Sequence, residues 1–108
     1  MAYDEELAER IRDVMDTSGE VSERKMFGGL AFMVGGNMAC GVVTDTLMLR
    51  LGPEGTLAAL SQPHVREMDF TGKAIRTMVF VEPDGLAGAE LARWVTEAVS
   101  YAASLPPK

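Results

Sequence analysis

Cys40 and His64 are the one cysteine and the one histidine of the chain, and together they are its best candidates for nucleophilic chemistry. A thiol becomes a strong nucleophile when a neighbouring imidazole takes its proton. Cys40 lies in the segment MACGV, among small and apolar neighbours, where a cysteine is usually buried and inert. His64 follows a proline, and no third residue in a distinctive context stands ready to orient it. We therefore expect no enzymatic activity.

Little in the sequence supports a metal-binding or phosphate-binding site either. A metal site needs several His, Cys, Asp or Glu ligands, and one cysteine with one histidine leaves only carboxylates. The glycine pairs at 28–29 and 35–36 match neither GxGxxG nor GxxxxGK[ST]. They are more typical of a bend and a hairpin turn. The sequence thus predicts no metal and no cofactor.

Methionine is abundant, with 8 residues in 108, and most of them fall in strand-like segments. Flexible thioethers either fill an irregular core or form an adaptable binding surface. In residues 47–51 three leucines alternate with Met48 and Arg50. Because successive strand residues point to opposite faces, this methionine and this arginine share the face without leucines.

The central part of the chain also holds most of its bases. Arg24 shares a strand face with Met26, and further bases follow towards the C-terminus. Two interpretations remain open, namely scattered solvated charge and a basic, methionine-rich patch that binds an anion or an acidic partner. The candidate residues of that patch are Met48, Arg50, Lys73 and Arg76.

Charge sets further limits on function. The 10 Lys and Arg residues against 16 Asp and Glu residues give a net charge of -6, concentrated towards the two ends of the chain. Direct nucleic-acid binding is disfavoured, since affinity for phosphates comes largely from Lys and Arg.

The acidic N-terminus is no signal peptide, and a single cysteine fits a reducing cytoplasm. Residues 26–44 carry no charge, but their five glycines favour a buried hairpin over a membrane span.

Periodicity predicts an α+β fold in one domain over residues 1–108. We expect a two-layer arrangement with an antiparallel sheet of about five strands, helices at both ends, and the order α-β-β-β-β-α-β-α. Residues 62–74 read as a loop. The expected helices are 3–18, 54–61 and 86–104, and the expected strands are 21–27, 30–34, 38–44, 47–51 and 75–81.

One block carries a family signature. RKMFGG at residues 24–29, followed by AFM at 31–33, GNM at 36–38 and GVV at 41–43, resembles the N-terminal domain of the TfoX/Sxy family of bacterial competence regulators. The likeness runs over residues 3–104. The motif residues are Arg24, Lys25, Met26, Phe27, Gly28 and Gly29.

The resemblance implies an α+β domain with an antiparallel sheet and supplies no catalytic residues, so the motif residues enter as structural or interaction residues. Named members of the family act as positive factors for competence genes together with the transcription machinery. Their N-terminal domain is followed by a second, helical domain, and we expect this chain to be the stand-alone form. In physical terms, a larger residue at Gly29 should be costly if its φ is positive.

We therefore expect a non-enzymatic regulatory or protein-interaction module in the cytoplasm. Its partner is another protein or a second copy in a homodimer, with no direct nucleic-acid contact and no membrane. The alternative is a small-ligand or anion-binding domain that uses the methionine-rich, arginine-bearing sheet face. A ligand binder should show an apolar pocket with converging bases, whereas an interaction module should show a broad exposed apolar patch.

Overall fold

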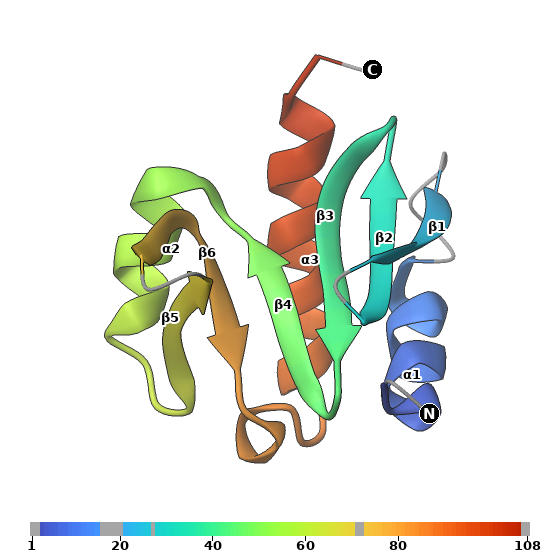
Figure 1. Cartoon of the computed structure of the whole chain (residues 1–108), viewed down its shortest axis with the longest axis horizontal. Helices are drawn as coiled ribbons and strands as arrows, with labels where there is room; N and C mark the ends of the chain where they lie inside the picture. The colour runs from blue at the N-terminus through green and yellow to red at the C-terminus, as the bar shows by residue number, and fades with distance from the viewer. Residues whose placement is uncertain (1–2, 16–20, 27, 71–72, 107–108) are drawn as a thin grey trace.

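The computed structural model describes residues 3–15, 21–26, 28–70 and 73–106, without the side chains at 26, 68–70 and 73–75. Its elements follow the chain in an order that alternates helices with runs of strands (Figure 1). They are α1 (Glu5–Met15), β1 (Val21–Met26), β2 (Gly29–Val34), β3 (Asn37–Val43), β4 (Thr46–Arg50), α2 (Gly52–Leu60), β5 (Val65–Phe70), β6 (Lys73–Val81), the short 3-10 helix η1 (Pro83–Gly85) and α3 (Glu90–Ser104).

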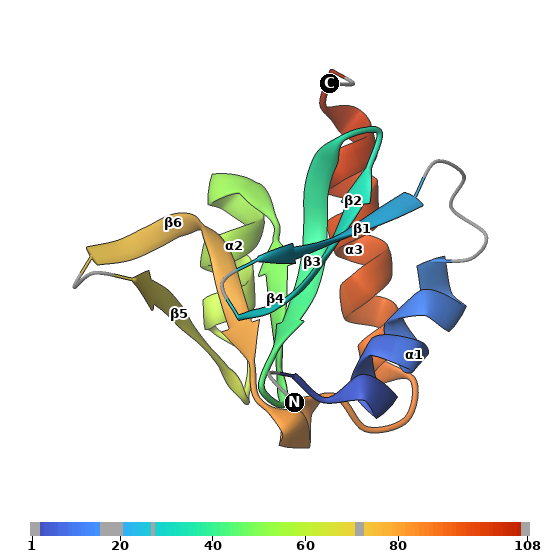
Figure 2. The same ribbon diagram turned by 45° about the vertical axis from the view of Figure 1, so that its right-hand side comes forward.

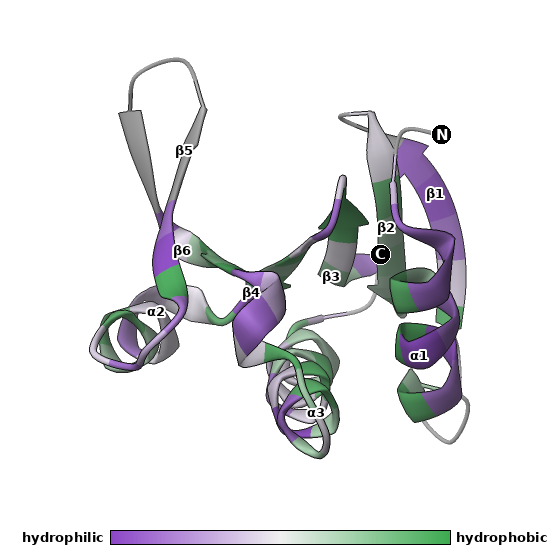
Figure 3. Cartoon of the chain, turned by 90° about the horizontal axis from the view of Figure 1, so that it is seen from below, coloured by the Kyte–Doolittle hydropathy of each residue, from purple (hydrophilic) through white to green (hydrophobic). Residues whose placement is uncertain are grey.

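The strands form one six-stranded sheet in the order β1-β2-β3-β4-β6-β5, and every neighbouring pair is antiparallel. Seen from below, the sheet is curved like a trough, with β3 and β4 at its base (Figure 3). All three helices lie on the convex side (Figure 3). The predicted α+β class is therefore confirmed, and we call the concave side, which no described helix covers, the uncovered face.

Helix α1 begins at an acidic cap. The Asp4 carboxylate Oδ1 accepts hydrogen bonds from the backbone N–H groups of Glu6 at 2.9 Å and Leu7 at 3.2 Å. Such a cap satisfies donors that the first helical turn cannot pair internally. Leu7, Ile11 and Met15 recur at helical spacing in the sequence, which predicts one apolar face, and the helix buries all three against the sheet and α3.

Strands β2 and β3 form a tight hairpin. Gly35 and Gly36 have φ values of 57° and 84°, which suits the two-residue turn that the GGN sequence predicts. The uncharged run that could have been mistaken for a membrane span is thus largely this hairpin. Among the described helices, none is long and apolar enough to cross a membrane.

Strand β4 shows the predicted alternation. Leu47 and Leu49 enter the main core, which also contains Trp94 of α3, while Met48 points to the other face. The turn before β4 lies at Thr44 and Asp45, one residue earlier than the sequence suggests, and Thr44 adopts a φ of 55°.

A sixth strand occupies much of the segment predicted as a loop. β5 covers Val65–Phe70 and pairs with β6 at the edge of the sheet. Its sequence, VREMDF, mixes three charged with three apolar residues, and charged side chains are common on edge strands because they discourage pairing with other chains. The prediction of a loop over 62–74 is therefore wrong for residues 65–70 and for residues 73–74, where β6 begins.

Candidate functional site

The uncovered face carries its own small hydrophobic group, which we call the second cluster. It consists of Met48 and Phe80, with Met38, Val43 and Met78 packed against them. Met48 is 0% exposed and Phe80 is 7% exposed, although no described helix covers this face. The sheet curves around this face (Figure 3), and the members of the second cluster pack against one another there. The prediction that Met48 belongs to a contact surface is therefore wrong, since its side chain is buried within the second cluster.

One cross-strand row runs through the second cluster from edge to edge. Its centre is apolar and each end is a guanidinium. The register places in line Arg24 of β1, Ala31 of β2, Gly41 of β3, Met48 of β4, Phe80 of β6 and Arg66 of β5. We call this line the arginine-ended row.

Gly41 makes room for the centre of the arginine-ended row. A Cβ added there would lie 2.8 Å from the Met48 Cε and 2.7 Å from the Leu30 carbonyl oxygen. Both distances are too short for a real side chain, so the Met48 methyl occupies the space over Gly41. The small residue on β3 thus lets the methionine of β4 fill the base of the trough.

Arg66 is held in place at the β5 end of the row. Its guanidinium lies 4.5 Å from the centroid of the Phe80 ring, and its Nε donates to Glu82 Oε1 at 2.8 Å. A cation over an aromatic face and a charge-assisted hydrogen bond each favour one orientation of the side chain. Arg66 therefore shields Phe80 as well as bringing charge to the edge of the face.

Arg24 is at the opposite end and lies free of such contacts. It is exposed, and no described residue gives it a hydrogen bond or an ion pair. On the helix side of the molecule, by contrast, Arg12 pairs with Glu9 and Glu23. Acids outnumber bases in this chain, so a shortage of carboxylates does not explain why Arg24 has no partner among the described residues.

The other predicted surface residues lie at the margin of the uncovered face. Arg50 pairs in register with Met78, but its guanidinium is 5.9 Å from the ring centroid of Tyr101 on α3, towards the helix layer. Arg76 is exposed on β6, beside the point where the pairing with β5 shifts register. The backbone of Lys73 pairs with Phe70, and its side chain is outside the described part of the structure.

The family-like motif spans the junction of β1 and β2. Arg24 and Lys25 are exposed on opposite faces of β1, and the Met26 backbone pairs with Gly29, whereas Phe27 lies outside the described residues. The positive φ that the sequence suggested for Gly29 is found at Gly28, with φ of 72° and open space around it. Gly29 has a different constraint, because an added Cβ would overlap the Val42 carbonyl oxygen.

The nucleophile and base considered from the sequence do not form a pair. Cys40 is buried in the main core, where its Sγ lies 3.8 Å from the Met15 Sδ, and burial raises the pKa of its thiol to about 12. His64 is exposed in the turn before β5 and has a φ of 68°. Within the described residues, no group of three or more His, Cys, Asp and Glu side chains is placed to hold a metal.

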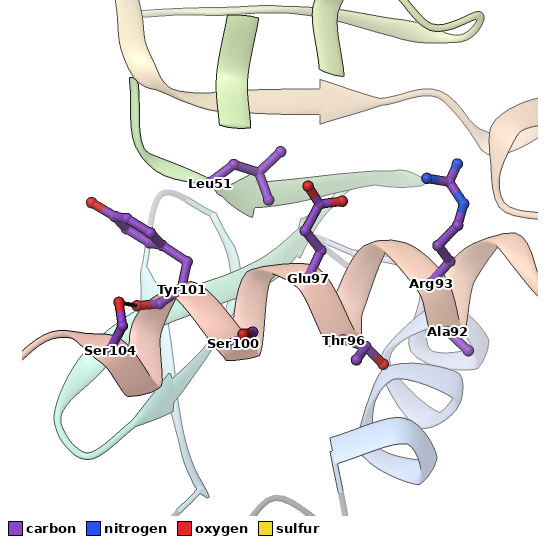
Figure 4. Close-up of a pocket in the computed structure, with 8 residues that line it drawn as sticks. All are labelled: Leu51, Ala92, Arg93, Thr96, Glu97, Ser100, Tyr101 and Ser104. Atoms are coloured by element: carbon purple, nitrogen blue, oxygen red, sulfur yellow. Dashed lines mark hydrogen bonds between the residues drawn. The ribbon is translucent and has the colours of Figure 1, made fainter. Parts of the chain in front are cut away.

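Two hollows lie on the helix side of the structure. A shallow groove of about 750 Å³ runs along α3, with Tyr101 and Glu97 on its wall and Leu51 at its base (Figure 4). A smaller hollow of about 240 Å³ contains His64, Asp84 and Arg93. Neither hollow is lined by the arginines of the arginine-ended row. The groove was missed from the sequence because α3 and the end of β4 meet only in the fold.

The orientation of β1 shapes the uncovered face further. Figure 2 shows β1, the edge strand beside β2, running at a steep angle to β3 and β4. Arg24 lies on this edge strand and Arg66 on the strand at the other edge, with the second cluster between them.

Comparison with known proteins assigns most of the chain. A family model described as the TfoX N-terminal domain matches residues 13–102 of the 108. No curated protein matches the chain.

Proposed function

This chain belongs to the TfoX N-terminal domain family, and we propose that it works as a regulatory protein-interaction module that binds its partner through the uncovered face. The proposed role is non-enzymatic and connected with transcriptional regulation. We place it in the cytoplasm, where a single buried cysteine stays reduced.

The observation that carries the proposal is the difference between the two faces of one sheet. The convex face is packed beneath α1, α2 and α3, whereas the concave face carries the second cluster and is covered by no described helix. A sheet needs an apolar layer on one side only, and its other side is usually polar. Here the second side is apolar at its centre, with Met38, Val43 and Met78 partly exposed, as on a surface that meets a partner.

A protein partner is favoured over nucleic acid by charge. The net charge of -6 repels a phosphate backbone at long range, and the uncovered face offers few cations against that field. Protein interfaces need only a modest number of charges around an apolar centre. The partner is another protein or a second copy of this chain.

Photocrosslinking in the host cell tests the proposal. A photoreactive amino acid at Ser22, exposed on the uncovered-face side of β1, should capture a protein in high yield. The same group at Thr96, exposed on α3, is the matched control and should capture little. Protein adducts that form equally at both positions, or only at Thr96, would contradict the proposed surface.

A further inference from the structure

We propose that the segment that docks on the uncovered face is acidic at both ends and apolar between, so that its carboxylates reach Arg24 and Arg66. This inference rests on the proposed function, since it names the chemistry of the partner at the same surface. It is drawn from the distribution of charge over the two sides of the sheet.

The uncovered face is poor in acids. In β1 to β4 the described residues that register and alternation place on this side are Ser22, Arg24, Ala31, Met33, Met38, Gly41, Val43, Thr46, Met48 and Arg50, and none is acidic. Towards the β5 edge, Glu82 is paired with Arg66. The acids of α1 lie in the layer of helices, on the other side of the sheet.

Arg24 has the chemistry to bind a carboxylate, and no described carboxylate contacts it. A guanidinium presents a planar array of donors that matches a carboxylate in a two-point contact. Among the described residues, the guanidinium groups of Arg12, Arg66 and Arg93 each have a carboxylate within 4.0 Å, whereas exposed Arg24, like exposed Arg76, has none. A partner carboxylate would give Arg24 the contact that these three side chains already have.

The length of the row sets the size of the segment. Six strands about 4.8 Å apart give about 24 Å between the ends of a flat row, and the curvature shortens this distance. An extended segment of roughly seven residues covers that span. Its middle residues would lie over Met48 and Phe80, where the partly exposed thioethers of Met38 and Met78 can adapt to them.

Two charge reversals on neighbouring residues of β1 test the inference. Arg24→Glu and Lys25→Glu change the net charge equally, and both residues are exposed, but they lie on opposite faces of the strand. We expect Arg24→Glu to reduce the photoadduct at Ser22 by about tenfold or more, while Lys25→Glu leaves it within about twofold. Mass spectrometry of the adduct should map the captured segment to a stretch with several Asp or Glu residues. Circular dichroism should show both variants folded.

The possible adducts distinguish a failure of the acidic-partner proposal from a failure of the proposed docking surface. A protein adduct on a neutral or basic segment, or one that is insensitive to Arg24→Glu, would overturn the acidic partner and leave the docking surface standing. Adducts to nucleic acid, or no adduct at Ser22, would overturn both. An adduct to the acidic helix of a second copy of this chain would overturn the proposal that the partner is a different protein. It would show that the chain associates with itself instead.

Discussion

On the helix-covered side of the sheet, Arg12 is held by Glu9 and Glu23 and Arg93 by Glu90, whereas on the uncovered side Arg24 has no partner among the described residues. The apolar layers differ in the same way. The main core joins both ends of the chain through α1 and α3, while the second cluster centres on two buried residues, Met48 and Phe80.

Interactions within the fold explain the residues on the helix-covered side of the sheet more fully than those on the uncovered side. Burial in the main core and pairing with carboxylates stabilise the helix layer without any other molecule. On the uncovered side, the solvated Arg24 and the partly exposed methionines gain little from the fold. This difference between the two sides is what supports the proposal of a docking surface on the uncovered face.

Alanine substitutions of two adjacent residues of β4 should cause the largest losses of unfolding free energy. Leu49→Ala should cost about 4 kcal/mol of unfolding free energy and Met48→Ala about 2 kcal/mol, since both delete a fully buried side chain but only Leu49 lies under the helices. Urea unfolding followed by Trp94 fluorescence measures both values. An equal or greater loss for Met48→Ala would show that the uncovered side is packed as firmly as the covered one.

The junction of β1 and β2 gives the next effect. Gly29→Val should cost about 3 kcal/mol, because the new side chain would overlap the Val42 carbonyl oxygen in β3. The matched control is Gly28→Asn, which should cost less than about 1 kcal/mol, since asparagine tolerates a positive φ and the site is open. Thermal unfolding compares the two. Equal losses would mean that the bend, and not the close approach to β3, constrains this motif.

The smallest expected effect is on the pH dependence of stability when Arg12 or Arg24 is replaced by alanine. The hydrogen bond and charge of Arg12 hold the pKa of Glu23 below its usual range, so this pair contributes stability when Glu23 is ionised and loses it as the pH falls through the lowered pKa. Arg12→Ala should cost about 1 kcal/mol at pH 7, and the loss should fade in acid. Arg24→Ala should change stability by less than about 0.5 kcal/mol at either pH. If Arg12→Ala still lowers the unfolding free energy at a pH below the lowered pKa of Glu23, the packing of the Arg12 side chain, and not the ion pair, stabilises the fold.

Local sequence patterns predicted the parts of the fold that depend on neighbouring residues. The alternation around Met48, the glycines at 35 and 36 and the apolar spacing of α1 each constrain a short segment directly, and all three are confirmed. Strand β5 was missed because its charged residues read as a loop, and it becomes a strand only by pairing with β6.

The features of the candidate site depend on contacts between distant segments. Whether Met48 is exposed is set by the curvature of six strands, which no single segment encodes. The sequence likewise gave no sign that Arg50 would approach Tyr101, because those residues lie on different elements. That Arg24 and Arg66 end one row follows only from the complete strand order.

Arginine footprinting tests most directly whether the uncovered face is the one that a partner covers. Phenylglyoxal would be applied to the purified chain and to the chain in an extract of its host, and each arginine would be quantified by mass spectrometry. We predict that Arg24 is modified readily in the purified chain and protected in the extract, while Arg93 on α3 reacts equally in both. Unchanged modification of Arg24, or protection of Arg93 alone, would contradict the assignment of the uncovered face as the docking surface.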